Sequence, residues 1–161
     1  MPSSFPAYAT RWIDESPVEE YTPSQVSGET LELGDLCVWD DSNNWVERAG
    51  TDPTAIVGIA EVRSEAARVL TANGKIPIRV IHPQTIFAMA SATDYVEATH
   101  RNQMYGVVRD ANGNWLVDVS ETTNKRVLVI DGIPASFGPG QSNIWFVKFI
   151  GDYLVLDAIT S

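Results

Sequence analysis

Cysteine is almost absent from the sequence. Cys37 is the only one in 161 residues, so the chain can form no internal disulfide. It lies in the apolar run 36–39, which predicts a small buried hydrophobic residue instead of a nucleophile. Long apolar runs are missing too, and a membrane-spanning helix needs about 20 such residues. The N-terminus, Met-Pro-Ser-Ser, has no apolar segment of the secretory type, so we expect a soluble chain with no membrane partner.

Positive charge is also scarce. The chain has 11 Lys and Arg residues against 21 Asp and Glu residues, a net charge of −10. Direct binding to a phosphate backbone relies on clustered cations, and no run of Lys or Arg occurs here. We therefore expect no direct nucleic-acid partner. The acidic balance predicts solubility, and it also suits a protein that avoids nucleic acid or rests on a basic or neutral partner surface.

Motifs by which an enzyme is recognised from sequence are missing as well. The glycine-rich segment 136–140 lacks the Lys and Ser/Thr of a phosphate-binding loop and precedes a strand, not a helix. His82 and His100 are far apart, with no Cys or Glu at ligand spacing. Segment 110–114 does not match a calcium loop in the position of its glycine, so it is predicted to be a hairpin turn. We expect no metal, no cofactor and no enzymatic activity.

Three acidic residues near two tryptophans leave one catalytic alternative open. Asp40, Asp41 and Asp52 could act as paired carboxylates in hydrolysis, which needs a fixed separation and one raised pKa in a cleft. Trp39 and Trp45 lie close to them in sequence. However, Asp is a typical turn residue, and tryptophan on a hairpin commonly packs against its own core. The pattern therefore favours turns over an active site.

Short apolar segments separated by turn residues run from residue 30 to the end of the chain. This pattern is typical of an all-β fold, and it predicts a single compact β-sandwich or β-barrel domain over residues 29–161. Residues 91–103 are predicted to form a loop or a short helix, and residues 64–68 at most one helical turn. The expected strands are 36–39, 45–48, 55–63, 75–80, 85–90, 104–109, 114–119, 126–130, 144–150 and 153–156.

Residues 1–28 have a different composition and are predicted to form an extended, irregular N-terminal arm. They contain four prolines and no strand or helix period. A disordered tail usually has fewer aromatic residues than this segment. Two interpretations stay open: the arm packs back on its own domain, or it lies with its aromatic side chains on a neighbouring subunit. The candidate contact residues are Phe5, Tyr8, Trp12 and Tyr21.

A tight corner, AGTDP, joins two strands in the segment 45–62. Gly50 is expected to adopt a conformation that other residues resist, and Pro53 to restrict Asp52 to non-helical backbone. We expect Asp52 to cap the turn. Gly58 interrupts the following apolar strand, which indicates a bulge or a close approach of another backbone. The corner is thus predicted to be structural.

The order of these features resembles that of capsid cement proteins, also called decoration or head-stabilising proteins, of tailed bacteriophages. The resemblance is carried by SGETLELGDLCVWDDSNNWVERAGTDPTAIVGIAEV, in which a Gly-Asp turn enters an apolar strand and an A-G-x-D-P-x-x-I-x-G-I-A block follows. A G-K-I strand at 74–78 and the segments TIFAMA, YGVVRDANGNWLVD and FVKFI follow in the same order. The likeness covers most of residues 26–157 and leaves the arm outside it.

This resemblance implies a structural, non-enzymatic virion protein that is made in the host cytoplasm and binds the outer capsid surface. Its implied partners are the major capsid protein and itself, often as a trimer, and its implied role is to stabilise the shell by bridging capsid subunits. The alternative from the residues themselves is a carbohydrate- or receptor-binding β-module displayed on a particle. That alternative predicts open aromatic faces at Trp39, Trp45 or Trp115, because sugar rings stack on them.

Overall fold

The computed structural model describes residues 8–9, 17–24, 29–61, 75–137 and 142–155, and these residues form an all-β fold, as predicted. The one α-helix among them, α1 (Glu97–His100), lies in the segment expected to be a loop or short helix. No helix in these ranges has the length and apolar character needed to span a membrane. The strands are Tyr8–Ala9 (β1), Val18–Tyr21 (β2), Leu36–Asp40 (β3), Trp45–Arg48 (β4), Ile56–Ala60 (β5), Ile76–Val80 (β6), Ile86–Ser91 (β7), Met104–Arg109 (β8), Trp115–Asp118 (β9), Val127–Gly132 (β10) and Ile144–Phe149 (β11).

Strands β7 to β11 close into a five-stranded barrel, here called the C-terminal barrel. Their order is β7-β11-β10-β8-β9, and a parallel pairing of β9 with β7 completes the ring. The other neighbours in the ring are antiparallel. β1 adds to β7 beside Phe87 and Ala88. Closure pairs strand edges that would otherwise be open to association with other chains.

Strands β2 to β6 form a second, antiparallel sheet, here called the N-terminal sheet. Its order is β2-β6-β5-β3-β4. A parallel bridge between Pro23 and Val46 brings the two end strands together, and the Ser24 amide donates to the Val46 carbonyl at 2.8 Å. Pro77 cannot donate a backbone hydrogen bond to a strand ladder. It is the second residue of β6, and β6 lies between β2 and β5.

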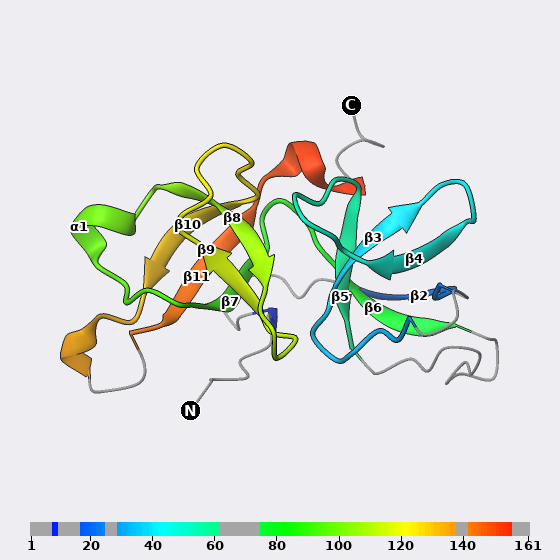
Figure 1. The fold of residues 1–161 in the computed structure, drawn as a ribbon, viewed down its shortest axis with the longest axis horizontal. Coiled ribbons are helices and arrows are strands. Elements are labelled where there is room, and N and C mark those ends of the chain that lie inside the picture. The colour runs from blue at the N-terminus through cyan, green and yellow to red at the C-terminus, as the bar shows by residue number, and fades with distance from the viewer. Residues whose placement is uncertain (1–7, 10–16, 25–28, 62–74, 138–141, 156–161) are drawn as a thin grey trace.

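The N-terminal sheet and the C-terminal barrel lie side by side, and residues 81–85 connect β6 of the sheet to β7 of the barrel (Figure 1). β1 pairs with the C-terminal barrel, whereas β2, the next strand along the chain, pairs with the N-terminal sheet. After β11 the chain returns, and Leu154 forms a parallel bridge with Ile56 of β5. Residues 17–24, assigned to the arm from sequence, therefore contribute to the N-terminal sheet.

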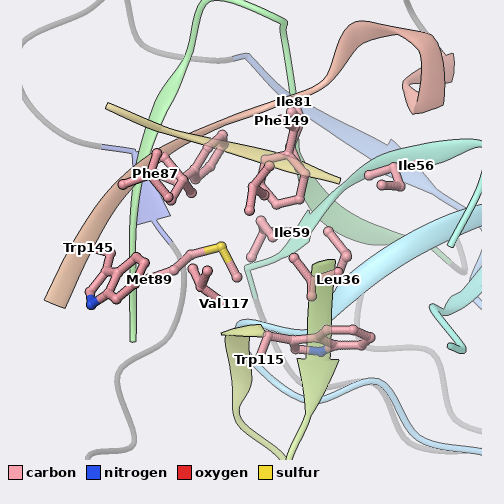
Figure 2. Packing of buried hydrophobic residues seen from close by; sticks show 14 of the residues in the cluster. Leu36, Ile56, Ile59, Ile81, Phe87, Met89, Trp115, Val117, Trp145 and Phe149 are labelled. Carbon is pink, nitrogen blue, oxygen red and sulfur yellow. The ribbon is translucent and has the colours of Figure 1, made fainter. Parts of the chain in front are cut away.

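One hydrophobic cluster joins the two units. Leu36, Ile56 and Ile59 of the N-terminal sheet pack in the same cluster as Phe87 and Trp115 of the C-terminal barrel (Figure 2). A second hydrophobic cluster is formed mainly by strands of the N-terminal sheet; its members are Leu31, Cys37, Val46, Val57, Ala60, Ile76 and Ile78. β5 contributes to both clusters and is buried along its whole length. Because the units share a core, they form one packed domain.

Some sequence-based expectations are wrong or cannot be compared. The strand expected at 153–156 does not form over its described residues 153–155: residues Gly151–Tyr153 make a 3-10 helix, η2, and Leu154 makes an isolated bridge to β5. A second 3-10 helix, η1, covers Ala135–Phe137. The helical turn expected at 64–68 lies outside the described residues.

Candidate functional site

The corner after β4 is a structural site. The sequence indicated an unusual backbone conformation at Gly50, but other residues of the corner adopt it. Asp52 has a φ of 53° and Ala55 a φ of 54°, both in the left-handed region. Gly50 does not have a positive φ, and a Cβ added there would meet nothing within 4 Å. The expectation that Gly50 supplies the special conformation is therefore wrong. Asp52 does accept a hydrogen bond, but from Asn124 Nδ2 at 2.9 Å, so it holds a distant loop to the corner.

Arg126 connects this corner to the C-terminal barrel. It is 4% exposed, and it lies directly before β10. Its Nε donates to the Pro53 carbonyl at 2.6 Å and its Nη2 to the Asp52 carbonyl at 3.0 Å. Its guanidinium also covers the ring of Tyr153 in η2. The AGTDP corner is thus the place where one buried arginine joins three segments far apart in sequence.

Gly58 is required by a close backbone approach, as predicted. A Cβ at this position would lie 2.1 Å from the carbonyl oxygen of Arg79 in β6. The pairing of β5 with β3 also shifts register between Cys37 and Val38, opposite Gly58 and Ile56. Both interpretations of this glycine, the bulge and the close approach, are therefore confirmed.

Asp35 forms a second junction that the sequence did not reveal. Its side chain is 1% exposed. Oδ2 accepts from Arg48 Nε and from the Glu32 amide, each at 2.8 Å. Oδ1 accepts from Arg109 Nε at 3.2 Å and from Trp115 Nε1 at 3.1 Å. A single buried carboxylate therefore joins β4 of the N-terminal sheet to β8 and β9 of the C-terminal barrel.

The only local signal for this junction was the Gly34-Asp35 pair, interpreted as a turn. Gly34 does have a φ of 88°, which a turn of this kind requires. The partners of Asp35, however, are Arg48, Arg109 and Trp115, up to 80 residues away. A pattern within one segment carries no information on such pairs, so only the folded chain could identify the carboxylate as a junction.

Two hollows lie on either side of Arg109, at the boundary between the two units. The first has a volume of about 200 Å³. The second has a volume of about 340 Å³. The first is lined by Ala49, Gly50, Thr51, Val107, Val108, Arg109 and Trp115. The second is lined by Glu32, Leu33, Arg109, Ala111, Asn112, Gly113 and Asn114. Apolar side chains thus meet an arginine at the surface of the junction.

The three acidic residues considered for hydrolysis are engaged in turns or exposed. Asp40 Oδ1 accepts from the Ser42 amide at 2.9 Å, and Asn43 Nδ2 donates to Asp40 Oδ2 at 2.7 Å. The hydrogen bond from Asn43 lowers the pKa of Asp40 below its usual value. Asp41 is exposed, and Asp52 binds Asn124. None of the three lines either hollow beside Arg109.

The tryptophans of the carbohydrate-binding alternative are buried or half-buried. Trp115 is 3% exposed and donates to Asp35. Trp39 is half-buried, and Tyr21 packs edge-on against it with ring centres 6.2 Å apart. Trp45 is half-buried as well. Buried Trp115 therefore offers no open aromatic face on which a sugar ring would stack.

The four aromatic residues proposed as contacts of the arm are placed only in part. Phe5 and Trp12 lie outside the described residues. Tyr8 belongs to β1, whose backbone pairs with β7. Tyr21 belongs to β2, is half-buried against Trp39, and donates from its hydroxyl to Glu19 at 3.2 Å. Tyr21 therefore contacts its own domain.

The remaining candidate groups also serve packing. Cys37 is fully buried, and this burial raises the pKa of its thiol far above its usual value. His100 is buried with its ring centre 4.6 Å from that of Trp145, and its Nδ1 accepts the Val96 amide at 2.9 Å. Burial lowers the pKa of His100. Among the described ranges no three His, Cys, Asp or Glu side chains lie together as metal ligands would.

Comparison with protein-family models gives no match for this chain. Comparison with curated proteins gives no significant match either. The fold itself defines the class: an all-β protein in which a five-stranded barrel and a second five-stranded sheet are joined through a shared core.

Proposed function

We propose that the protein is a structural virion component that binds the outer surface of a tailed-phage capsid and stabilises it by bridging major capsid subunits. The proposal starts from the sequence resemblance to capsid cement proteins. It gives the protein no enzymatic activity and no cofactor. In this proposal the protein is made in the host cytoplasm and then binds the outer surface of the virion. It binds the shell as single copies or associated with further copies of itself.

The proposal depends most on the structural role of the A-G-x-D-P block, which is part of that resemblance. In this chain the block forms the corner that Arg126 fastens to the C-terminal barrel through the carbonyls of Asp52 and Pro53. A protein that clamps its neighbours needs such rigidity, because a deformable linker between contact surfaces would weaken the clamp. Many copies on one shell also let weak individual contacts add up. The net charge of −10 suits an outer face that meets no nucleic acid.

A co-sedimentation assay with purified, expanded shells that lack this protein tests the binding. The full chain is expected to sediment with the shells and to saturate at a fixed copy number per shell. Saturated shells should then retain their genome to a higher temperature, or through a stronger osmotic shock, than bare shells. Equal survival of bare and saturated shells would contradict the stabilising role.

A truncation tests the contribution of the N-terminal arm. Residues 17–24 belong to the N-terminal sheet, so the variant begins at Pro17 and keeps β2 intact. It is expected to remain folded and to bind shells more weakly, because the aromatic residues Phe5, Tyr8 and Trp12 are gone. Binding as tight as that of the full chain would contradict a role of the arm in shell contact.

A further inference from the structure

The bond between Asp52 and Pro53 is the only Asp-Pro bond in the sequence, and the backbone before it is strained. Asp52 has a φ of 53°, in the left-handed region that is uncommon for residues other than glycine. A residue before proline is restricted further, because the proline ring confines it to extended backbone with a negative φ. Asp52 therefore departs from both preferences. Such strain persists only where the surrounding structure enforces it, and it occurs often at places where chemistry takes place.

Arg126 holds the carbonyl group of this strained bond. Its Nη2 donates to the Asp52 carbonyl oxygen at 3.0 Å, and its Nε donates to the Pro53 carbonyl oxygen at 2.6 Å. The arginine is 4% exposed and lies over the ring of Tyr153, so its position is fixed. A fixed cation withdraws electron density from a carbonyl carbon, and it stabilises negative charge on the carbonyl oxygen more strongly where water is excluded. The carbonyl of Asp52 is therefore activated for attack by a nucleophile.

The side chain of Asp52 supplies a nucleophile next to this carbonyl. Its Oδ2 accepts from Asn124 Nδ2 at 2.9 Å, and Oδ1 has no donor within the described ranges. Attack of Oδ1 on the carbonyl carbon of the same residue closes a five-membered ring. Both groups belong to one residue, so the reaction needs no encounter between separate molecules. Asp carboxyl groups form covalent intermediates in this way in enzymes as well.

We propose that the chain cleaves its own Asp52–Pro53 bond through a cyclic anhydride of Asp52. Oδ1 forms a bond to the carbonyl carbon of Asp52, and the carbonyl oxygen takes up negative charge beside Arg126. The carbonyl reforms as the C–N bond to Pro53 breaks, and the nitrogen takes the proton of the undissociated carboxyl group. One water molecule then opens the anhydride. The products are two carboxyl groups on Asp52 and a secondary amine on Pro53.

Cleavage leaves the two fragments together. β3 belongs to the first fragment and pairs with β5 of the second, and Asp35 binds Arg109 across the cleaved bond. Thr51 and Thr54 are exposed, so water reaches the corner. The reaction releases the strain at Asp52 and takes place once in each chain, so it is not a catalytic turnover. It does not rest on the proposed function, and its test uses no shell.

The proton that the leaving nitrogen needs makes cleavage faster in mild acid, because only the undissociated carboxyl group carries it. The ionisable groups on the segments that meet the corner are Arg48, Glu121, Lys125, Arg126, Asp152 and Tyr153. Arg126 contacts Asp52 directly. Glu121 is linked to it through Asn124, whose backbone amide donates to Glu121 Oε1 at 2.8 Å.

The test is an incubation of the purified full-length protein at about pH 5.5 and about pH 7.5, with circular dichroism to verify that the chain stays folded. Samples are then denatured and analysed by mass spectrometry. Fragments of residues 1–52 and 53–161 are expected, and they should accumulate about tenfold faster or more at the lower pH. In the presence of aniline, fragment 1–52 should carry an anilide, because an anhydride reacts with this amine.

A peptide with the sequence of residues 48–55, acetyl-Arg-Ala-Gly-Thr-Asp-Pro-Thr-Ala-amide, measures what the fold contributes. It contains the same Asp-Pro bond without the contacts of Arg126 and without a fixed backbone. The folded chain is expected to cleave about tenfold faster or more than this peptide at the same pH.

Variants separate the site from unspecific hydrolysis. Asp52→Asn keeps a side chain that tolerates the left-handed region but removes the carboxyl group, and it should slow cleavage by about tenfold or more. Arg126→Gln removes the cation from the carbonyl oxygen and should slow it to a similar extent. Asp41→Asn is the matched control and should change nothing, because Asp41 is exposed and lies outside the corner.

Each result decides for or against the proposal. The absence of fragments, a folded chain that cleaves no faster than the peptide, or a fragment 1–52 without an anilide overturns it. Equal cleavage of Asp52→Asn and the native chain also overturns it, since a contaminating protease would give that result. If Arg126→Gln fails to fold, Asp52→Asn, the peptide and the anilide still decide.

Discussion

The guanidinium carbon of Arg126 lies 3.8 Å from the centre of the Tyr153 ring. The same guanidinium donates to two carbonyls of the corner after β4, so the cation has both an aromatic face and fixed acceptors. This arrangement explains how a charged side chain is 4% exposed in an acidic protein. It also makes the corner depend on the geometry of one arginine.

Arg126→Lys is expected to lower the free energy of unfolding by about 2–3 kcal/mol, because an ammonium cannot reproduce the planar set of hydrogen bonds and the stacking on Tyr153. Urea denaturation measures the change. Arg101→Lys is the control, since its pair with Glu97 is exposed, and it should cost less than about 0.5 kcal/mol. An equal, small effect of both variants would mean that Arg126 does not fasten the corner.

Two glycines in the same segment are expected to respond in opposite ways to alanine. Gly58→Ala brings a Cβ against a backbone oxygen, so it should cost about 3 kcal/mol or more or prevent folding. Gly50→Ala has free space and no positive φ, so it should be neutral or stabilise by up to about 1 kcal/mol. Thermal unfolding of both variants, followed by circular dichroism, distinguishes them. A strongly destabilised Gly50→Ala would contradict the conformation described for the corner.

Asp35→Asn is expected to destabilise the protein by about 3 kcal/mol, since it removes a buried carboxylate that pairs with two guanidiniums and accepts from the Trp115 indole. Chemical denaturation measures this loss, and the Trp115 indole signal should shift at the same time. Asp41→Asn serves as control because Asp41 is exposed. If both variants unfold at the same denaturant concentration, Asp35 does not hold the two units together.

The stability of the protein is expected to fall on mild acidification because of His100. Burial lowers the pKa of His100 in the folded chain below the value of about 6.5 in the unfolded chain. The unfolded state therefore binds a proton first, and stability that is fully present above about pH 6.5 is lost as the pH falls toward the folded pKa. Protonation also removes the Nδ1 acceptor of the Val96 amide.

His100→Phe keeps a ring against Trp145 but cannot titrate. It should be less stable than the native protein at pH 7.5, because the Val96 amide loses its acceptor. Its unfolding free energy should change less between pH 7 and pH 5, by up to about 1.4 kcal/mol per pH unit. Denaturation at several pH values measures both slopes. Identical slopes would show that His100 does not contribute to the acid sensitivity.

The sequence by itself determined the local elements. Short apolar segments between turn residues predicted β3, β4, β6 and β8, and the turn at Gly113 forms with a φ of 88°. The role of Gly58 was predictable because a glycine inside an apolar strand usually marks a bulge or a close approach of another backbone. These features depend on backbone preferences and on side-chain period, which neighbouring residues decide.

The tertiary structure alone decided which segments meet. The strand expected at 153–156 gave way to η2, in which Tyr153 packs under Arg126, a residue 27 positions earlier. Asp35 became a junction because β4, β8 and β9 bring three donors to one carboxylate. Such contacts join residues far apart in the chain, and their energies arise only when burial removes water from both partners, which no local pattern records.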